Sequence, residues 1–300
     1  MARRMGREGR RGLVRLLAPL MAAAALAATV VVAGVAAPAS AAPLNYVALG
    51  DSYTAGAGIL PLSSTISPLC LQTTLNYPHL IAHADGFDLQ DVSCSGATSG
   101  DMTSSQYPGV APQFDALSGS TSVVTVGIGG NDNDLFVGAL VDCGVTDILD
   151  FLNIGSPCKD IYGNTFANDV SGDASTIGGV LQGVHARSPH AQVFVVGYPD
   201  LLPQSGHCYP TMPLTTGDTS YLNGIEEDLN SMLQSEASAF GATFVNTFTP
   251  SIGHDACKSS SVRWINPIIA SGGGISVHPN PTGESELATF VRSALSSKGL

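Results

Sequence analysis

Three short polar motifs contain the residue types needed for acyl transfer. Ser52, in Gly-Asp-Ser-Tyr, directly follows an apolar run, and a serine hydroxyl becomes a nucleophile when a base lies beside it. Asn131, in Gly-Gly-Asn-Asp, follows a second apolar run and carries an amide that can donate to an oxyanion. His278, in Val-His-Pro-Asn, could be the base. Together they could supply a nucleophile, a base and an oxyanion donor.

Each motif also has a simpler structural interpretation. Gly-Asp-Ser is typical of an Asx turn that caps a helix, and the chain has seven histidines, so one beside a Pro-Asn turn is weak evidence alone. The segment around Asn131 could be a plain turn, and it lacks the later Gly and Glu of a calcium loop. The position of Ser52 at the end of a buried strand favours the catalytic interpretation.

An oxyanion site and an oriented histidine need further groups. The backbone N–H of Gly96 is a candidate oxyanion donor, although an ordinary small-residue loop is an equal alternative. A catalytic histidine normally donates its second ring N–H to an orienting acceptor. An aspartate three residues before His278 would be the usual choice, but that position is Ile275. We therefore expect the main-chain carbonyl of Ser276 or Ile275, or a distant acid, in this role.

Alternating strands and helices are expected to bring these groups together. Apolar runs predict buried strands at Asn45–Gly50, Ser122–Gly130, Ala191–Pro199 and Ala242–Phe248. Helices are predicted at Tyr77–Ala84, Asp169–Arg187, Asp218–Gly241 and Gly283–Gly299. The strands are almost continuously apolar, which favours a parallel sheet covered on both faces. Functional groups in such sheets gather at the carboxyl ends of the strands, where Ser52 and Asn131 lie.

Two features near Ser52 indicate how a substrate could be received. Gly56 and Gly58 lack side chains, so we expect them to let a substrate approach the hydroxyl closely. Leu, Ile and Pro are plentiful in residues 59–75, which suggests that this segment forms an apolar acyl site. The sequence thus predicts that the segment following the serine contacts the substrate.

Residues 1–41 have the pattern of an export signal. A basic start precedes an Ala/Val/Leu-rich stretch from Leu16 to Ala37, and Ala39-Ser40-Ala41 matches a small-x-small cleavage pattern. A membrane anchor is the alternative, but the cleavage pattern and the lack of a charged flank after it favour removal. Arg10–Arg15 matches a twin-arginine signal only loosely, which leaves the export route open. We predict a secreted protein with one domain, residues 42–300.

The charge of this domain excludes one class of partner. Six of the 12 basic residues but only one of the 24 acidic residues lie in 1–41, so residues 42–300 carry a formal charge of −17. Such a surface repels phosphate backbones, so we expect no nucleic-acid binding. It also offers no attraction to anionic membranes, although a lipid substrate could still bind through apolar contacts.

The cysteines indicate disulfides rather than a metal site. An even number of cysteines in an exported chain predicts three disulfides, but sequence alone cannot select the pairs. A zinc site is the weaker alternative because the chain has no C-x-x-C pair. Nucleotide-binding glycine motifs are also missing, so we expect no metal and no cofactor. The six cysteines are Cys70, Cys94, Cys143, Cys158, Cys208 and Cys257.

The motifs together resemble those of the SGNH, or GDSL-type, hydrolases. The four family letters match Ser52, Gly96, Asn131 and His278 in chain order, and the resemblance extends over residues 47–283. Five longer segments resemble secreted actinomycete lipases and esterases: YVALGDSYTAGAG, CSGAT, GYPDLLP, RWINP and VHPNPTGE. Ile275 departs from the family, in which most members have aspartate at that position. Some relatives of this subgroup use a backbone carbonyl to orient the histidine.

The resemblance implies a fold, an activity and a site. The implied fold is a three-layer α/β/α sandwich with a flavodoxin-like parallel sheet. The implied activity is carboxylic-ester hydrolysis of an ester or lipid through an acyl-Ser52 intermediate, with no cofactor. The oxyanion would lie on the N–H groups of Ser52 and Gly96 and the amide of Asn131. Disulfides in this subgroup join neighbouring cysteines, which implies the pairs Cys70–Cys94, Cys143–Cys158 and Cys208–Cys257.

Two other functions remain as alternatives. A glycan O-acetyl esterase is possible within the same family, but few aromatic residues and a single tryptophan, Trp264, argue against a long sugar platform. A secreted binding protein that keeps the fold without the activity would lack a catalytic residue, whereas this chain has all four family residues. We expect a monomeric, secreted lipase or esterase.

Overall fold

The computed structural model describes residues 42–150, 152–269 and 273–300. The predicted export segment, residues 1–41, lies outside the described residues, so its removal remains a prediction. Within the described ranges, no helix has the length and apolar character needed to cross a bilayer.

A five-stranded parallel sheet forms the centre of the domain. Its spatial order is β2-β1-β3-β4-β5, with every neighbouring pair parallel. The strands are β1 (Asn45–Gly50), β2 (Asp88–Asp91), β3 (Val123–Gly127), β4 (Gln192–Val196) and β5 (Thr243–Val245). The order reverses between β1 and β3, and the Ser52 and Asn131 motifs follow these two strands. This reversal creates the crevice at which parallel sheets usually bind ligands.

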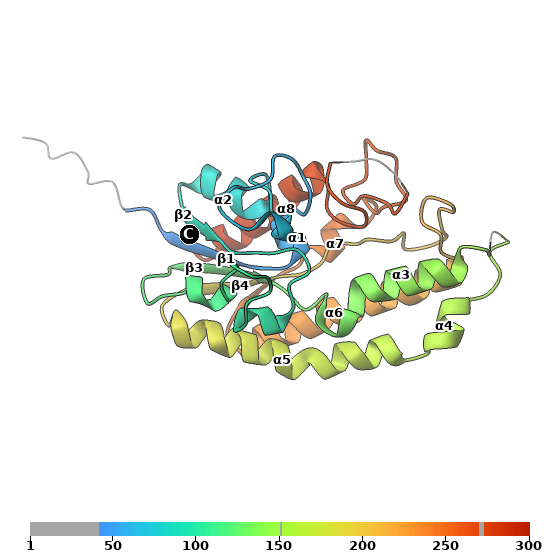
Figure 1. Ribbon diagram of the computed structural model, residues 1–300, viewed down its shortest axis with the longest axis horizontal. Coiled ribbons are helices and arrows are strands. Elements are labelled where there is room, and N and C mark those ends of the chain that lie inside the picture. The colour runs from blue at the N-terminus through green and yellow to red at the C-terminus, as the bar shows by residue number, and fades with distance from the viewer. Residues whose placement is uncertain (1–41, 151, 270–272) are drawn as a thin grey trace, which may run out of the picture. The chain divides into compact units, whose positions relative to one another are not determined.

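Helices cover both faces of the sheet, as the near-continuous apolar strands predict. Helices α2 and α8 lie on one side, and α5 and α6 lie on the other (Figure 1). The long or central helices are α2 (Tyr77–Asp85), α3 (Leu135–Asp147), α5 (Thr165–Arg187), α6 (Thr216–Ala239) and α8 (Pro281–Ser297). The short ones are α1 (Ser52–Ala55), α4 (Pro157–Tyr162) and α7 (Phe248–Ser251). The predicted three-layer α/β/α sandwich is confirmed.

Strand residues alternate between the two layers of core. Tyr46 and Ala48 of β1 pack in the cluster beneath α2 and α8, whereas Val47 and Leu49 pack in the larger cluster beneath α5 and α6. This alternation follows from the two-residue period of a strand. Because both faces are buried, β1 is held in a single register, which fixes the position of Ser52 just beyond its end.

Strand β2 and helix α3 are among the elements that were not predicted from the sequence, as are the short helices α4 and α7. Strand β2 has the polar sequence Asp-Leu-Gln-Asp and lies at the sheet edge, where it pairs only with β1. Its strand conformation therefore depends on its neighbour rather than on an apolar run of its own. Helix α3 is apolar almost throughout, so it lacks the clear stripe that made α6 and α8 recognisable.

The disulfides are the three pairs that the family resemblance implies. Cys70 is bonded to Cys94, Cys143 to Cys158, and Cys208 to Cys257. The first joins the segment after α1 to the loop after β2, and the second joins α3 to α4. Each disulfide fixes a connecting segment that the sheet itself does not hold.

Candidate active site

The turn after β1 places Ser52 at the start of a helix. Asp51 caps α1, because its Oδ1 accepts a hydrogen bond of 2.9 Å from the N–H of Tyr53. Ser52 is the first residue of α1, so its own N–H has no partner within the helix. A Cβ on Gly50 would lie 2.6 Å from the carbonyl oxygen of Gly127, so only glycine fits before the turn. The motif is thus both a capped turn, with Asp51 as the cap, and a serine held at the sheet edge.

The structure places His278 against Ser52, 226 residues earlier in the chain. Its Nε2 lies 2.7 Å from the Oγ of Ser52, and its Nδ1 lies 2.7 Å from the carbonyl oxygen of Ser276. Of the two carbonyls considered from the sequence, Ser276 therefore contacts the ring. The carbonyl of Ile275 instead accepts from the side chain of Asn266, at 3.2 Å. This arrangement is the hydrogen-bonded nucleophile, base and orienting acceptor of acyl transfer.

Residues that were not predicted as site residues hold the histidine loop in place. Asn266 exchanges main-chain hydrogen bonds with this loop, donating to the His278 carbonyl at 2.9 Å and accepting from Val277 at 2.7 Å. Val277 has a φ of 56°, which is unusual for a β-branched residue, and its carbonyl accepts a 2.6 Å bond from the Tyr53 hydroxyl. The Tyr53 ring also packs on the His278 ring, with centroids 4.8 Å apart. These contacts fix the backbone and ring orientation of the base.

The loop containing Gly96 faces the serine from the other side. Gly96 has a φ of 78°, a conformation that favours glycine. Its neighbours are anchored, because Ser95 donates to the carbonyl of Cys70 and Ala97 donates to that of Cys94. The Cys70–Cys94 disulfide closes the same segment. Among the described hydrogen bonds, none uses the N–H of Gly96, which leaves it available to an oxyanion.

Asn131 is held beside this loop at the end of the β3 segment. Its Nδ2 donates one hydrogen bond of 2.9 Å to the Ala97 carbonyl, and the second hydrogen on that nitrogen remains for a substrate. The next residue, Asp132, accepts from the N–H and hydroxyl of Ser99 at 2.7 and 2.5 Å. The two oxyanion loops are therefore tied to each other.

Tyr198, in the segment after β4, connects the nucleophile turn to the Asn131 loop. Its hydroxyl accepts from the N–H of Gly130 at 2.8 Å and donates to Asp51 Oδ2 at 2.5 Å. Gly130 is obligatory here because a Cβ would lie 2.8 Å from that hydroxyl. From the sequence, the Gly-Tyr-Pro segment was placed at the end of a predicted strand and matched to the family, with no role in the site. Nothing in its local pattern indicated this contact, which spans 147 positions.

All four family residues line one cavity of about 470 Å³. Ser52, Gly96, Asn131 and His278 lie on its wall together with Val141 of α3. The structure thus brings together every residue that the four motifs predicted. No cluster of His, Cys, Asp or Glu suited to a metal ion occurs in the described part of the chain.

The electrostatics of the site favour an uncharged histidine. Burial lowers the pKa of the His278 imidazole to about 4, although the hydrogen bond to Ser276 acts in the opposite direction. The neutral ring can therefore accept the proton of Ser52 at neutral pH. Burial also raises the pKa of Asp51 to about 7, against the hydrogen bonds from Tyr198 and Tyr53.

Two predictions about the segment after Ser52 were wrong. A Cβ on Gly56 would lie 2.7 Å from Thr73, and one on Gly58 would lie 2.8 Å from Ile275, so these glycines admit other parts of the chain rather than a substrate. No residue of 59–75 lines the 470 Å³ cavity. Its apolar wall comes instead from Val141, and from Ile275 beside the histidine.

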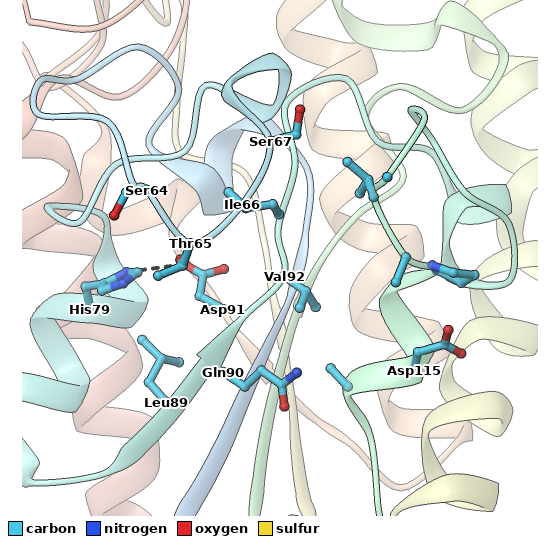
Figure 2. Close-up of a pocket in the computed structure, with 15 residues that line it drawn as sticks. Ser64, Thr65, Ile66, Ser67, His79, Leu89, Gln90, Asp91, Val92 and Asp115 are labelled. Atoms are coloured by element: carbon cyan, nitrogen blue, oxygen red, sulfur yellow. Dashed lines mark ion pairs between the residues drawn. The ribbon is translucent and has the colours of Figure 1, made fainter.

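A larger cavity lies elsewhere in the described chain. It has a volume of about 640 Å³, borders strand β2 and shares no lining residue with the Ser52 cavity. His79 lies 3.4 Å from Asp91 on its wall (Figure 2). The described contacts of the His79 ring are with Asp91 and Asn76, and the ring does not line the Ser52 cavity.

Comparisons with known proteins identify the family. A model of the GDSL-like Lipase/Acylhydrolase family matches residues 48–285. Lipase 2 of Streptomyces coelicolor is 44% identical over 264 residues, which cover 87% of this chain and 89% of the relative. The crystal structure of phospholipase A1 from Streptomyces albidoflavus NA297 superposes with a TM-score of 0.71 at 30% identity, covering 84% of this chain and 99% of that one.

A second solved structure agrees with the first. The extracellular lipase of Streptomyces rimosus superposes with a TM-score of 0.70 at 27% identity, and covers 84% of this chain and 99% of its own. The chain therefore belongs to the GDSL-like lipase/acylhydrolase family.

Proposed function

We propose that the protein is a serine carboxylic-ester hydrolase that cleaves acyl esters through an acyl-Ser52 intermediate. The observation that carries the proposal is the 2.7 Å contact between Ser52 Oγ and His278 Nε2, inside a cavity also lined by Gly96 and Asn131. The names of its relatives, lipases and an esterase from Streptomyces, support an ester or lipid substrate. A binding protein without activity would have no need of this hydrogen-bonded pair.

The reaction takes place in two steps. The neutral His278 ring accepts the Ser52 proton while Oγ attacks the ester carbonyl, and the ring then protonates the departing alcohol. Water, deprotonated by the same ring, attacks the acyl-enzyme, and the ring returns that proton to Ser52 Oγ as the acid leaves. The carbonyl of Ser276 orients the ring in both steps. In each tetrahedral intermediate the oxyanion lies on the N–H groups of Ser52 and Gly96 and on the amide of Asn131.

A substrate series tests this proposal against a glycan O-acetyl esterase. Trp264, the chain's single tryptophan, stacks on His254 at 3.8 Å and does not line the Ser52 cavity, so no aromatic sugar platform adjoins the serine there. We expect hydrolysis of nitrophenyl esters with acyl chains from acetyl to palmitoyl, with a preference for chains longer than acetyl. Release of acetate from acetylated xylan at a higher kcat/KM than any of these esters would contradict the lipase or esterase assignment.

The location and assembly of the protein follow from the same reasoning. We propose cleavage after Ala41, secretion, and action as a monomer free of a membrane anchor. The similarity to the extracellular lipase of Streptomyces rimosus supports secretion. The three disulfides also support it, because disulfides persist in oxidising compartments. N-terminal sequencing of the secreted protein measures the cleavage site, and sedimentation analysis measures the oligomeric state. A mature chain that begins at Met1 would contradict the cleavage.

Removing the Asn131 amide is expected to slow the chemical step. Asn131→Ala deletes an oxyanion donor, so kcat should fall by about 10²–10³-fold with little change in KM. Steady-state kinetics on a soluble nitrophenyl ester measure both constants. Asn133→Ala is the matched control, because this nearby amide bonds to Asp173 and does not line the cavity. An equal loss of kcat in both variants would show that Asn131 is only structural.

The lowered pKa of His278 predicts an acid-tolerant enzyme. The base must be unprotonated, so kcat/KM should fall only when the pH drops through about 4, rather than near the usual 6.5. In the unfolded chain this histidine binds a proton below about 6.5, so the same shift makes folding less stable as the pH falls from about 6.5 to 4. Circular dichroism at each pH separates unfolding from titration. An acid limb near pH 6.5 in folded enzyme would contradict the prediction.

A further inference from the structure

One face of α3 and the segment after it expose an unusual number of apolar side chains. Half of the large apolar residues that are exposed in the described chain, seven of fourteen, lie between positions 141 and 161. Val141 and Val145 lie one turn apart on α3, and Ile148 follows at its C-cap. Leu149 and Leu152 come just after the helix, with exposures of 84% and 65%. Contiguous apolar surface of this kind marks a binding surface in soluble proteins.

These exposed residues adjoin the active-site cavity through Val141. Val141 lines the Ser52 cavity and also a neighbouring cavity of about 290 Å³. That second cavity is walled by Val145 and Ile148 and by residues beside the histidine, including Val277. Among its nine lining residues, only Ser276 has a polar side chain. An acyl chain could thus lie in this apolar second cavity, which shares Val141 with the Ser52 cavity.

Helix α3 is anchored on its buried side. Cys143, on the opposite face of α3, is fully buried and is bonded to Cys158 of α4. Asp147, at the end of α3, accepts a 2.8 Å hydrogen bond from the N–H of Thr215. Helix α3 and α4 lie together at the end of the domain remote from β2 (Figure 1). The helix that carries Val141 and Val145 is therefore tied to α4 and to the segment before α6.

The charges of this region select the kind of partner. Asp142 of α3 and Asp160 of α4 are exposed, and Lys159 is the only basic residue between positions 135 and 165. Residues 42–300 as a whole carry a formal charge of −17. An anionic lipid surface would be repelled, whereas an uncharged or zwitterionic one would accept the apolar side chains without electrostatic cost.

We propose that this surface, defined by Val141, Val145, Ile148, Leu149 and Leu152, docks on the surface of aggregated uncharged or zwitterionic lipid. The proposal rests on the proposed ester hydrolysis, and it names the physical form of the substrate. Docking places the mouth of the two adjoining cavities at the lipid surface, so that an ester enters without crossing water. Outward from Ser52, an acyl chain would then pass through the cavity, along Val141 and out to Leu149 and Leu152 at the lipid surface.

A binding assay without turnover tests the docking directly. The Ser52→Ala protein is mixed with vesicles of phosphatidylcholine, or of phosphatidylcholine with 30% phosphatidylglycerol, and the bound fraction is measured by sedimentation. Leu149→Ser with Leu152→Ser, two residues that line neither cavity, should weaken binding to phosphatidylcholine about tenfold or more. The matched control is Leu69→Ser with Ile252→Ser, which are also exposed and line neither cavity. The control pair should bind as the parent does.

Three results would overturn the docking proposal. They are equal binding by the parent and the Leu149/Leu152 variant, an equal loss in the control pair, and tighter binding to the anionic vesicles. Analytical ultracentrifugation adds a fourth, a dimer that the Leu149/Leu152 substitutions dissociate, which would assign the surface to a second copy of the chain.

Kinetics with active enzyme separate this proposal from the proposed function. With Ser52 intact, the Leu149/Leu152 variant should hydrolyse a dissolved butyrate ester at the parent rate and an emulsified trioleate about tenfold more slowly. If the parent hydrolyses no ester at all, the proposed function fails while the vesicle result still decides the docking. If both substrates are cleaved at parent rates by the variant, the docking fails and the function stands.

Discussion

Replacing Ser52 with alanine is expected to lower kcat/KM for a soluble ester on the order of 10⁴-fold or more. The alanine methyl group cannot attack the carbonyl or form the acyl-enzyme, so only binding and the oxyanion donors remain. The fold should survive, because the change removes one hydrogen bond, that to His278, worth about 0.5–1.5 kcal/mol. Steady-state kinetics and thermal unfolding of the same preparation give both quantities.

A neighbouring serine supplies the control. Ser95 lines the same cavity, and Ser95→Ala should retain activity within a few fold. If Ser52→Ala kept a kcat/KM close to that of Ser95→Ala, the hydroxyl at position 52 would not be the nucleophile.

Replacing His278 with alanine should have an effect of the same size. Without the ring, the Ser52 hydroxyl keeps its proton at neutral pH and is a poor nucleophile. Because the two residues act as one unit, the Ser52→Ala, His278→Ala double variant should be no slower than either single variant. Kinetics of the three proteins on one ester measure this lack of additivity.

Another histidine provides the comparison for this second prediction. His79 contacts Asp91 and Asn76, away from the Ser52 cavity, and His79→Ala should retain near-parent activity. If the losses of kcat/KM in the two single variants multiplied in the double variant, the two side chains would contribute independently. That result would contradict their action as one hydrogen-bonded unit.

The orientation of His278 by a main-chain carbonyl, rather than by a carboxylate, affects the pKa of the ring. The Ser276 carbonyl fixes which nitrogen of His278 carries the proton, but it brings no negative charge to stabilise an imidazolium. Burial then dominates and lowers the pKa of the ring to about 4. An aspartate at the position of Ile275 would favour the charged ring and raise that pKa. The predicted acid tolerance is thus a consequence of having the uncharged Ser276 carbonyl as the orienting acceptor.

The sequence predicted most of the site because its chemistry is concentrated in short motifs. Gly-Asp-Ser after an apolar run, Gly-Gly-Asn after another, and a histidine just before the final helix could each be recognised locally. The parallel-sheet prediction then placed two of them at one edge, as the structure has them. Gly96 was marked by its small-residue loop, and its positive φ gives the physical reason for the glycine.

The parts that could not be predicted depend on long-range contacts. The contact of Tyr198 with Asp51 and that of Tyr53 with Val277 join residues far apart in the chain, and no local pattern encodes them. The choice of Ser276 over Ile275 as acceptor depends on the backbone conformation at Val277.

The apolar wall illustrates the same limit. It was expected in residues 59–75, which are rich in apolar residues, but Val141 of α3 and Ile275 form it instead. Helix α3 itself shows no clear periodicity in the sequence, so neither its position nor its exposed apolar residues could be predicted before the structure.

Labelling with a serine-reactive fluorophosphonate, followed by mass spectrometry of the digested protein, tests the central claim most directly. One adduct is expected, on Ser52, formed quickly in the parent protein, far more slowly in His278→Ala and not at all in Ser52→Ala. An active enzyme that carried the adduct on another serine, or carried none, would contradict the assignment of Ser52 and His278 as nucleophile and base.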